Sequence, residues 1–205
     1  MTLIGLTGGI ASGKSMIGAR LAALGAFRVD ADQLARDAVA PGSPGLSRVR
    51  ECFGPRVLND DGSLDRAALG ELVFSDPAAL EQLNAIVHPE VRRLASESFA
   101  RARAADPDAI IVYEIPLLAE TGRNDEWDLV VVAEAPVDQR VVRMVELRGM
   151  SEEDARRRIA NQASDAERRA LADIVIDTSG SETHTLDQVD ELWEKLTSGR
   201  TQRTS

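Results

Sequence analysis

Lysine is nearly absent from this sequence, because Lys14 and Lys195 are the only two among 24 basic residues. A single cysteine, Cys52, excludes an intrachain disulfide. We find no secretory leader pattern and no apolar run long enough to cross a membrane. The net charge of −10 argues against non-specific binding to nucleic acid or membrane, because both are anionic. These absences predict a soluble cytoplasmic protein that holds any anionic ligand with locally concentrated positive groups.

The pattern of apolar residues predicts the fold class. The chain has 205 residues, enough for one α/β domain with inserted subdomains. Five short apolar runs alternate with helical patterns, and the predicted strands are Leu3–Leu6, Phe27–Val29, Ile110–Glu114, Leu129–Ala133 and Ile174–Ile176. This alternation predicts a doubly wound, five-stranded parallel sheet flanked by helices. We expect a core from residues 1–40, 106–139 and 163–205, a helical insertion at 41–105 and a helical lid at 140–162. Asp65, Ser151 and Ser164 are expected to cap helices, and His88-Pro89 is expected to precede a new one.

A glycine-rich motif separates the first predicted strand from the first predicted helix. It matches the phosphate-binding pattern GxxxxGK[ST], and its residues are Gly8, Gly9, Ile10, Ala11, Ser12, Gly13, Lys14 and Ser15, followed by Met16. In such a loop, backbone N–H groups and the start of a helix face phosphate oxygens. Lys14 would contact the β- and γ-phosphates, and Ser15 would help to hold Mg²⁺. A chance glycine turn is the alternative, but the flanking strand and helix favour a nucleoside triphosphate site.

Carboxylates follow the second and third predicted strands. Asp30 and Asp32 come at the end of the second strand, which in a parallel sheet lies at the ligand-binding edge. Two explanations stay open: one of the pair does chemistry there, or Asp30 caps the next helix and Asp32 lies in its first turn. Glu114 ends the third strand and is a candidate to receive Mg²⁺ opposite Ser15.

Arginines are concentrated late in the chain, between residues 140 and 162. Arg140 and Arg143 are three residues apart and share a helical face, and we expect them to contact phosphate. The run from Arg156 to Arg158 is better explained as a solvated face with Glu–Arg pairs. A triphosphate loop, a nearby carboxylate, a helical insertion and an arginine-bearing hairpin together suggest phosphoryl transfer to a small acceptor, with the hairpin excluding water.

Several motifs resemble those of the dephospho-CoA kinases over nearly the whole chain. They are Leu6–Ser15, Asp30-Ala31-Asp32 with Ala35-Arg36, Asp61–Arg66, Leu83–Pro89, Glu114–Leu118, and Gln162 leading to Arg168 and Ala172-Asp173. The resemblance implies ATP-dependent phosphorylation of the ribose 3′-hydroxyl of dephospho-CoA, the last step of coenzyme A synthesis. It implies ATP and Mg²⁺ as cofactors, and no nucleic acid or membrane partner.

The resemblance also implies residue roles. Asp32 is the expected base, Lys14 and either Arg140 or Arg143 would stabilise the transferring phosphoryl group, and the insertion would bind the acceptor. The expected acceptor-side residues are Asp32, Arg36, Arg66, His88, Glu114, Pro116 and Leu117. Without the resemblance, a lone histidine such as His88 is more often structural.

Three other functions remain to be distinguished. The first is a kinase of the same fold that acts on another small nucleoside, nucleotide or sugar-like alcohol. A second is a regulatory GTPase, which would carry an Asn/Thr-Lys-x-Asp motif; neither Lys14 nor Lys195 lies in one. The third is a module that binds ATP without consuming it.

Overall fold

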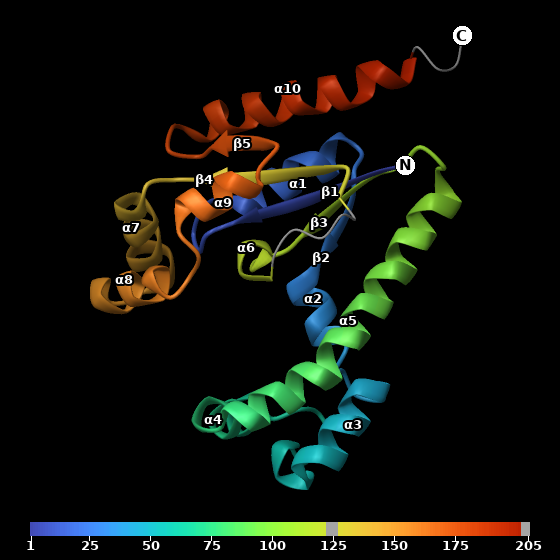
Figure 1. Ribbon diagram of the computed structural model, residues 1–205, viewed down its shortest axis with the longest axis vertical. Coiled ribbons are helices and arrows are strands. Elements are labelled where there is room, and N and C mark those ends of the chain that lie inside the picture. Colours follow the sequence, from blue (N-terminus) through green and yellow to red (C-terminus); the bar gives the residue numbers. More distant parts are fainter. Residues whose placement is uncertain (122–126, 202–205) are drawn as a thin grey trace. The chain divides into compact units, whose positions relative to one another are not determined.

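The computed structural model describes residues 1–121 and 127–201, which fold into the strands and helices of Figure 1. The strands are β1 (Thr2–Gly8), β2 (Phe27–Asp30), β3 (Ile110–Glu114), β4 (Leu129–Glu134) and β5 (Ile174–Asp177). The helices are α1 (Lys14–Leu24), α2 (Ala31–Asp37), α3 (Pro44–Phe53), α4 (Arg66–Ser75), α5 (Pro77–Ala105), α6 (Leu118–Thr121), α7 (Val137–Arg148), α8 (Glu152–Ala160), α9 (Asp165–Leu171) and α10 (Glu182–Thr201). A short 3-10 helix, η1, spans Pro55–Val57.

The five strands form one sheet in the order β2-β3-β1-β4-β5. Strand β1 pairs in parallel with β3 on one side and with β4 on the other, and β4 pairs in parallel with β5. The five-stranded parallel sheet predicted from the sequence is therefore confirmed. The register aligns Leu6 with Glu114, and Gly8 with Ala133. It brings the carboxyl ends of β3 and β4 to either side of the glycine-rich loop that follows β1.

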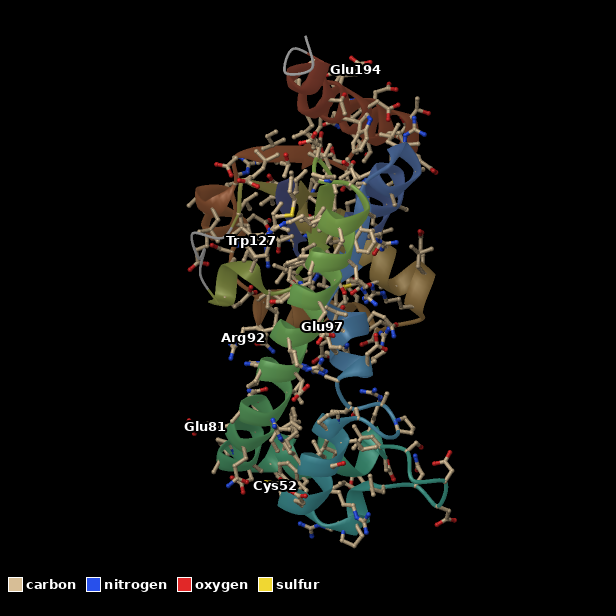
Figure 2. All side chains as sticks on the ribbon, turned by 90° about the vertical axis from the view of Figure 1, so that its right-hand side faces the viewer. Cys52, Glu81, Arg92, Glu97, Trp127 and Glu194 are labelled. Atoms are coloured by element: carbon tan, nitrogen blue, oxygen red, sulfur yellow. The ribbon has the colours of Figure 1, made fainter. Side chains whose placement is uncertain are left out.

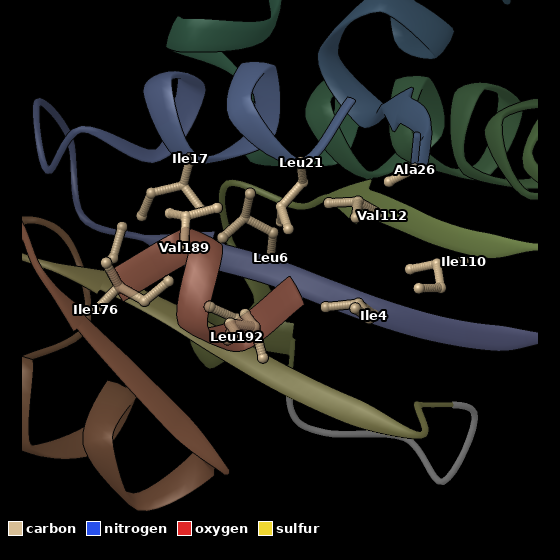
Figure 3. Close-up of a cluster of buried hydrophobic side chains, with 12 residues drawn as sticks. Ile4, Leu6, Ile17, Leu21, Ala26, Ile110, Val112, Ile176, Val189 and Leu192 are labelled. Carbon is tan, nitrogen blue, oxygen red and sulfur yellow. The ribbon is translucent and has the colours of Figure 1, made fainter. Parts of the chain in front are cut away.

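The core around the sheet follows the alternation of side chains along each strand. Figure 3 shows one face, where Ile17 and Leu21 of α1 and Val189 of α10 cover Leu6 and other buried strand residues. On β4, Val131 faces this cluster, whereas its neighbours Val130 and Val132 belong to a second cluster with Leu118. Because both faces of the central strands are buried, these strands read in the sequence as continuous apolar runs rather than as alternating patterns.

The chain divides into two compact units, residues 1–29 with 102–205 and residues 30–101. The first unit contains almost all of the sheet, and the second is helical. The helical unit has an apolar core of its own, formed by Val39, Val49, Phe53, Val57, Leu69 and Ala79. Figure 2 shows Glu81, Arg92 and Glu97 along α5, all of them exposed. The expected role of this region in holding the acceptor stays a prediction.

One predicted helix start is wrong. The sequence His88-Pro89 predicted a new helix after the proline, but α5 is a single helix from Pro77 to Ala105 with Pro89 inside it. Proline lacks the N–H that would bond to the carbonyl four residues earlier, so it usually ends a helix. Here buried residues lie on both sides of the proline, at Ala79 and Ala95, and packing along the helix offsets the missing bond.

The predicted helix caps are confirmed. Asp65 accepts hydrogen bonds from the N–H groups of Ala67 and Ala68 at the start of α4. Ser151 caps α8, and Ser164 forms a reciprocal capping box with Glu167 at the start of α9. Within the described residues, no helix combines the length and the apolar character needed to cross a membrane.

Candidate active site

The glycine-rich loop joins β1 to α1, and its backbone is unusual at two positions. Gly13 caps α1 with a φ of 85°, a conformation that side chains rarely adopt. Ala11 has a φ of 59° and is the one non-glycine residue with positive φ among the described residues. Such a backbone costs about 1–3 kcal/mol and persists only where the surroundings enforce it. The contacts of the loop explain how it is held.

Side chains from distant elements hold the loop by its backbone. The N–H of Ile10 donates to Oε1 of Gln162 at 2.8 Å. The buried hydroxyl of Thr178 lies 2.7 Å from the carbonyl oxygen of Ser12, to which it can donate. Nη1 of Arg143 donates to the carbonyl oxygen of Ala11 at 3.2 Å, and its Nη2 donates to the carbonyl of Thr178. Arg143 therefore stabilises the strained turn at Ala11.

Arg140 contacts the same loop in a different way. Its side chain is only 2% exposed and pairs through Nη2 with both carboxylate oxygens of Asp165, at 2.9 and 3.0 Å. A Cβ built on Gly9 would lie 2.1 Å from Nη1 of Arg140, so this guanidinium packs directly against the loop. Its Nε and Nη1 are buried, and neither has a hydrogen-bond partner among the described residues. Buried donors without partners carry a cost that an anion at the loop would remove.

The electrostatics around Arg140 favour binding of an anion. The pKa of the Arg140 guanidinium is lowered, mainly by burial and also by the nearby Arg168 charge, while the Asp165 carboxylate acts in the opposite direction. Arginine remains protonated at neutral pH despite such shifts. Arg168 is itself buried and bonds to the same Asp165 oxygen, Oδ1, at 2.9 Å. Two positive charges thus face one negative charge beside the loop.

The motif residues Lys14, Ser15 and Met16 form the first turn of α1. Lys14 begins the helix and is half-buried, while Ser15 is exposed. The N–H of Met16 donates to the carbonyl of Gly13 at 3.0 Å, so it belongs to the helix rather than to the open loop. The positive end of α1 adds to the charge of Lys14.

Glu114 is buried at the end of β3, and its carboxylate pairs with Arg28. It also lies against α1, since a Cβ on Gly18 would be 2.0 Å from Oε1 of Glu114. Gly18 is one helical turn beyond Ser15, the other expected Mg²⁺ ligand. The pairing with Arg28 was not expected from the sequence, because β2 and β3 are separated by 79 residues between Asp30 and Ile110.

Asp30 and Asp32 have the geometry of the second explanation, and a chemical role for Asp32 stays a prediction. Asp30 is the N-cap of α2, and its Oδ1 accepts from the N–H groups of Asp32 and Gln33 at 2.8 and 3.2 Å. Asp32 lies in the first turn of α2 and is exposed. Its carboxylate has no hydrogen-bond partner among the residues that the structure describes. Asp32 is thus available for chemistry, whereas Asp30 is engaged in the cap.

The remaining expected site residues lie on several elements. Arg36 is exposed in the last turn of α2, Arg66 begins α4, and His88 is exposed on α5, all in the helical unit. Pro116 and the 48%-exposed Leu117 follow β3 in the other unit. Their roles toward the acceptor stay predictions. The structure does bring together the loop, Arg140, Arg143 and Glu114, all within the sheet-containing unit.

Helices α7 and α8, which include the expected lid, pack on the loop. Val141 and Met144 of α7 form an apolar cluster with Ala155 and Ile159 of α8, and the loop residues Ile10 and Ala11 pack against it. The predicted solvated face is confirmed where Arg156 pairs with Glu152 and Asp138, and Arg157 with Asp154.

Sequence reasoning did not find Asp165, nor the contacts by which Gln162 and Thr178 support the loop. For Asp165 and Arg168 a signal existed, since their spacing of three residues places them on one face of α9. No local signal identifies Thr178, because its contact with Ser12 spans 166 residues.

Comparisons with known proteins agree with the geometry. A family model described as dephospho-CoA kinase matches residues 2–184. A dephospho-CoA kinase from Leifsonia xyli subsp. xyli is 56% identical over 196 residues, covering 96% of this chain and 99% of that relative. A crystal structure of a Thermus thermophilus protein is 36% identical with a TM-score of 0.82, covering 96% of this chain and 98% of its own. The structure of a dephospho-CoA kinase from Campylobacter jejuni shares the fold, with a TM-score of 0.73 at 23% identity and coverage of 97% and 98%.

Proposed function

This chain belongs to the dephospho-CoA kinase family, and from that premise we propose that it transfers the terminal phosphate of ATP to the ribose 3′-hydroxyl of dephospho-CoA. The products are coenzyme A and ADP, and the reaction is the final step of coenzyme A biosynthesis. We propose the cytoplasm as its location, in keeping with the lone cysteine and the absence of a membrane-length helix among the described residues.

The observation that best supports this function is the burial of Arg140 with unpaired donors beside the phosphate loop. It is a buried cation that packs on Gly9 of the phosphate loop and carries two donors without a partner among the described residues. A transferring phosphoryl group spreads negative charge over its equatorial oxygens, and donors already fixed beside it stabilise that charge without reorganising. We therefore assign Arg140 as the leading lid arginine and Arg143 as a support of the loop.

The nucleotide would occupy the loop 8–15, with Lys14 and the backbone N–H groups around the β- and γ-phosphates. The residues that would hold Mg²⁺ are Ser15, through its hydroxyl, and Glu114, whose carboxylate also pairs with Arg28 through Oε1. Two such oxygen ligands, with phosphate oxygens and waters, are a set that Mg²⁺ accepts. Glu114 at the end of β3 lies against α1 at Gly18, which is one helical turn beyond Ser15. Bound there, Mg²⁺ would neutralise charge on the β- and γ-phosphates.

The chemical step needs little covalent help from the protein, because the transition state is loose. The acceptor's 3′-oxygen forms a bond to the γ-phosphorus while the bond to the β–γ bridging oxygen breaks, and ADP leaves with that electron pair. The acceptor's proton passes to Asp32, whose exposed carboxylate is not engaged in the α2 cap. We place Arg36, Arg66, His88, Pro116 and Leu117 on the acceptor side.

Steady-state turnover on a panel of acceptors tests this function. We expect the highest kcat/KM with dephospho-CoA, compared with adenosine, AMP, shikimate and gluconate, and a product carrying phosphate on the 3′-oxygen by ³¹P NMR. A preference for another alcohol would reject dephospho-CoA as substrate while keeping a kinase. Binding of ATP without consumption, for every acceptor, would reject the catalytic assignment.

A further inference from the structure

Two buried arginines from different helices share one carboxylate beside the phosphate loop. Arg140 of α7 and Arg168 of α9 are 2% and 3% exposed, and both bond to Asp165 on α9. Among the described residues, Asp165 is the one carboxylate in ion-pair contact with either of them. The nearby Glu134 bonds instead to Arg169, at 2.9 and 2.7 Å.

The geometry of these bonds fixes the direction of the arginines. Arg140 gives its Nη2 to Asp165, which leaves Nη1 on the opposite side of the planar fork. That Nη1 is the atom nearest to Gly9, 2.1 Å from a Cβ built there, and Nη1 of Arg168 is 3.2 Å from the same point. Arg140 therefore faces the loop with one nitrogen and Asp165 with the other, whereas Arg168 uses the same Nη1 for Asp165 and for its approach to the loop.

The charges make this arrangement dependent on Asp165. Two guanidiniums close together repel each other, and burial makes the repulsion stronger than it would be in water. One carboxylate between them offsets this repulsion but leaves one net positive charge for the loop. Without it, the pair would separate or one member would turn toward solvent.

We propose that Asp165 is a positioning residue that holds Arg140, together with Arg168, in the orientation needed to contact the transferring phosphoryl group. The inference rests on the proposed function of the site. It assigns to Asp165 no contact with ATP or with the acceptor, so its effect passes through Arg140.

A double-mutant cycle tests this dependence. Asp165→Asn keeps the size of the side chain and removes its charge, and we expect kcat to fall by about 10- to 100-fold, as for other residues that orient a catalytic group. The KM for ATP should change by less than about threefold, because an interaction specific to the transition state affects kcat first. In an Arg140→Met background the same change should alter kcat by less than about twofold.

A merely structural role would give a different pattern. It would lower the melting temperature and reduce kcat equally in both backgrounds, and that outcome would overturn the proposal. Should Asp165→Asn not fold, Asp165→Glu takes its place in the cycle, since it keeps the charge but shifts it by one methylene. Asp190→Asn is the matched control, because Asp190 also pairs with an arginine, Arg20, through two bonds of 2.7 and 2.6 Å. It should leave kcat unchanged.

A binding measurement separates this proposal from the proposed substrate. ADP with Mg²⁺ and aluminium fluoride imitates the transferring group and requires no acceptor. Asp165→Asn should weaken binding of this complex at least about tenfold while the affinity for ADP alone changes less than about threefold. Failure of the wild type to phosphorylate dephospho-CoA would reject the substrate and leave this result standing. Equal binding of the mimic by wild type and variant would reject the role of Asp165.

Discussion

Replacing Gly9 with alanine should remove most of the activity while leaving the fold intact. The backbone at Gly9 is not in the left-handed region, so alanine can adopt it without strain. The new Cβ, however, would lie 2.1 Å from Nη1 of Arg140, whereas ordinary contacts begin at 3.4 Å. The guanidinium must therefore shift by about 1.3 Å, and displacements of about 1 Å at a catalytic group cost on the order of 10²-fold in rate.

This prediction needs kcat and stability measured on the same protein. A coupled assay of ADP release gives kcat and the KM for ATP, and thermal unfolding gives the melting temperature. We expect kcat to fall about 10²-fold, because the buried arginine can move only by disturbing its bond to Asp165. The melting temperature should change less, because the new Cβ meets the end of a side chain and not the backbone. Gly70→Ala on α4 is the control, since nothing lies within 4 Å of its Cβ. It should stabilise the helix by about 0.5–1 kcal/mol and leave kcat unchanged.

The Arg140→Met background decides the cause. If the Cβ acts by displacing Arg140, Gly9→Ala should change kcat by less than about threefold once that guanidinium is gone. A full 10²-fold loss in this background would mean that the methyl group obstructs the phosphate itself. A folded Gly9→Ala enzyme with kcat within about threefold of wild type would refute the assignment of Arg140 altogether.

Four further replacements test other residues assigned to the site. Asp32→Asn should lower kcat by about 10²- to 10⁴-fold with little change in KM, as loss of a general base does. Asp30→Ala should instead cost about 0.5–2 kcal/mol of stability, because the α2 cap is lost. Equal kinetic effects of the two replacements would contradict the assignment of Asp32 as base and Asp30 as cap. Gly18→Ala would place a Cβ 2.0 Å from Oε1 of Glu114. It should lower the free energy of unfolding by about 1–3 kcal/mol, measured in urea. An unchanged unfolding midpoint would show that the carboxylate moves freely. Thr178→Val removes the hydroxyl that donates to the carbonyl of Ser12, and it should lower the free energy of unfolding by about 1–3 kcal/mol and raise the KM for ATP. A variant with normal stability and normal KM would exclude Thr178 as a support of the loop.

Much of the fold was predictable because its signals are local. Four of the five strands are short apolar runs, β2 has the mixed sequence Phe27–Asp30, and the alternation with helices predicts a parallel sheet. Caps such as Ser164 with Glu167 were readable for the same reason. The continuous helix through Pro89 was not, because the local rule that proline ends a helix was overridden by packing on both sides.

Residues of the candidate site could be predicted only where they belong to a sequence motif. The phosphate loop and Lys14 follow from GxxxxGK[ST], whereas Thr178 and Asp165 gain their roles from contacts across the sheet and between helices. Pairing of Glu114 with Arg28 likewise depends on strand order, since β2 lies beside β3 only once the chain has folded. Spacing along the sequence contains no such information.

The two lid arginines show why residue type and spacing are insufficient to assign roles. Arg140 and Arg143 share a helix and a face, so periodicity gives both the same expected function. Their surroundings differ. Arg143 donates to the carbonyls of Ala11 and Thr178, whereas Nε and Nη1 of Arg140 have no hydrogen-bond partner among the described residues. A donor already bonded to a carbonyl gains little from a phosphate, because one bond replaces another, whereas a buried unpaired donor gains the whole bond. We therefore expect Arg140 to stabilise charge at the phosphoryl group and Arg143 to stabilise the loop that binds the phosphates.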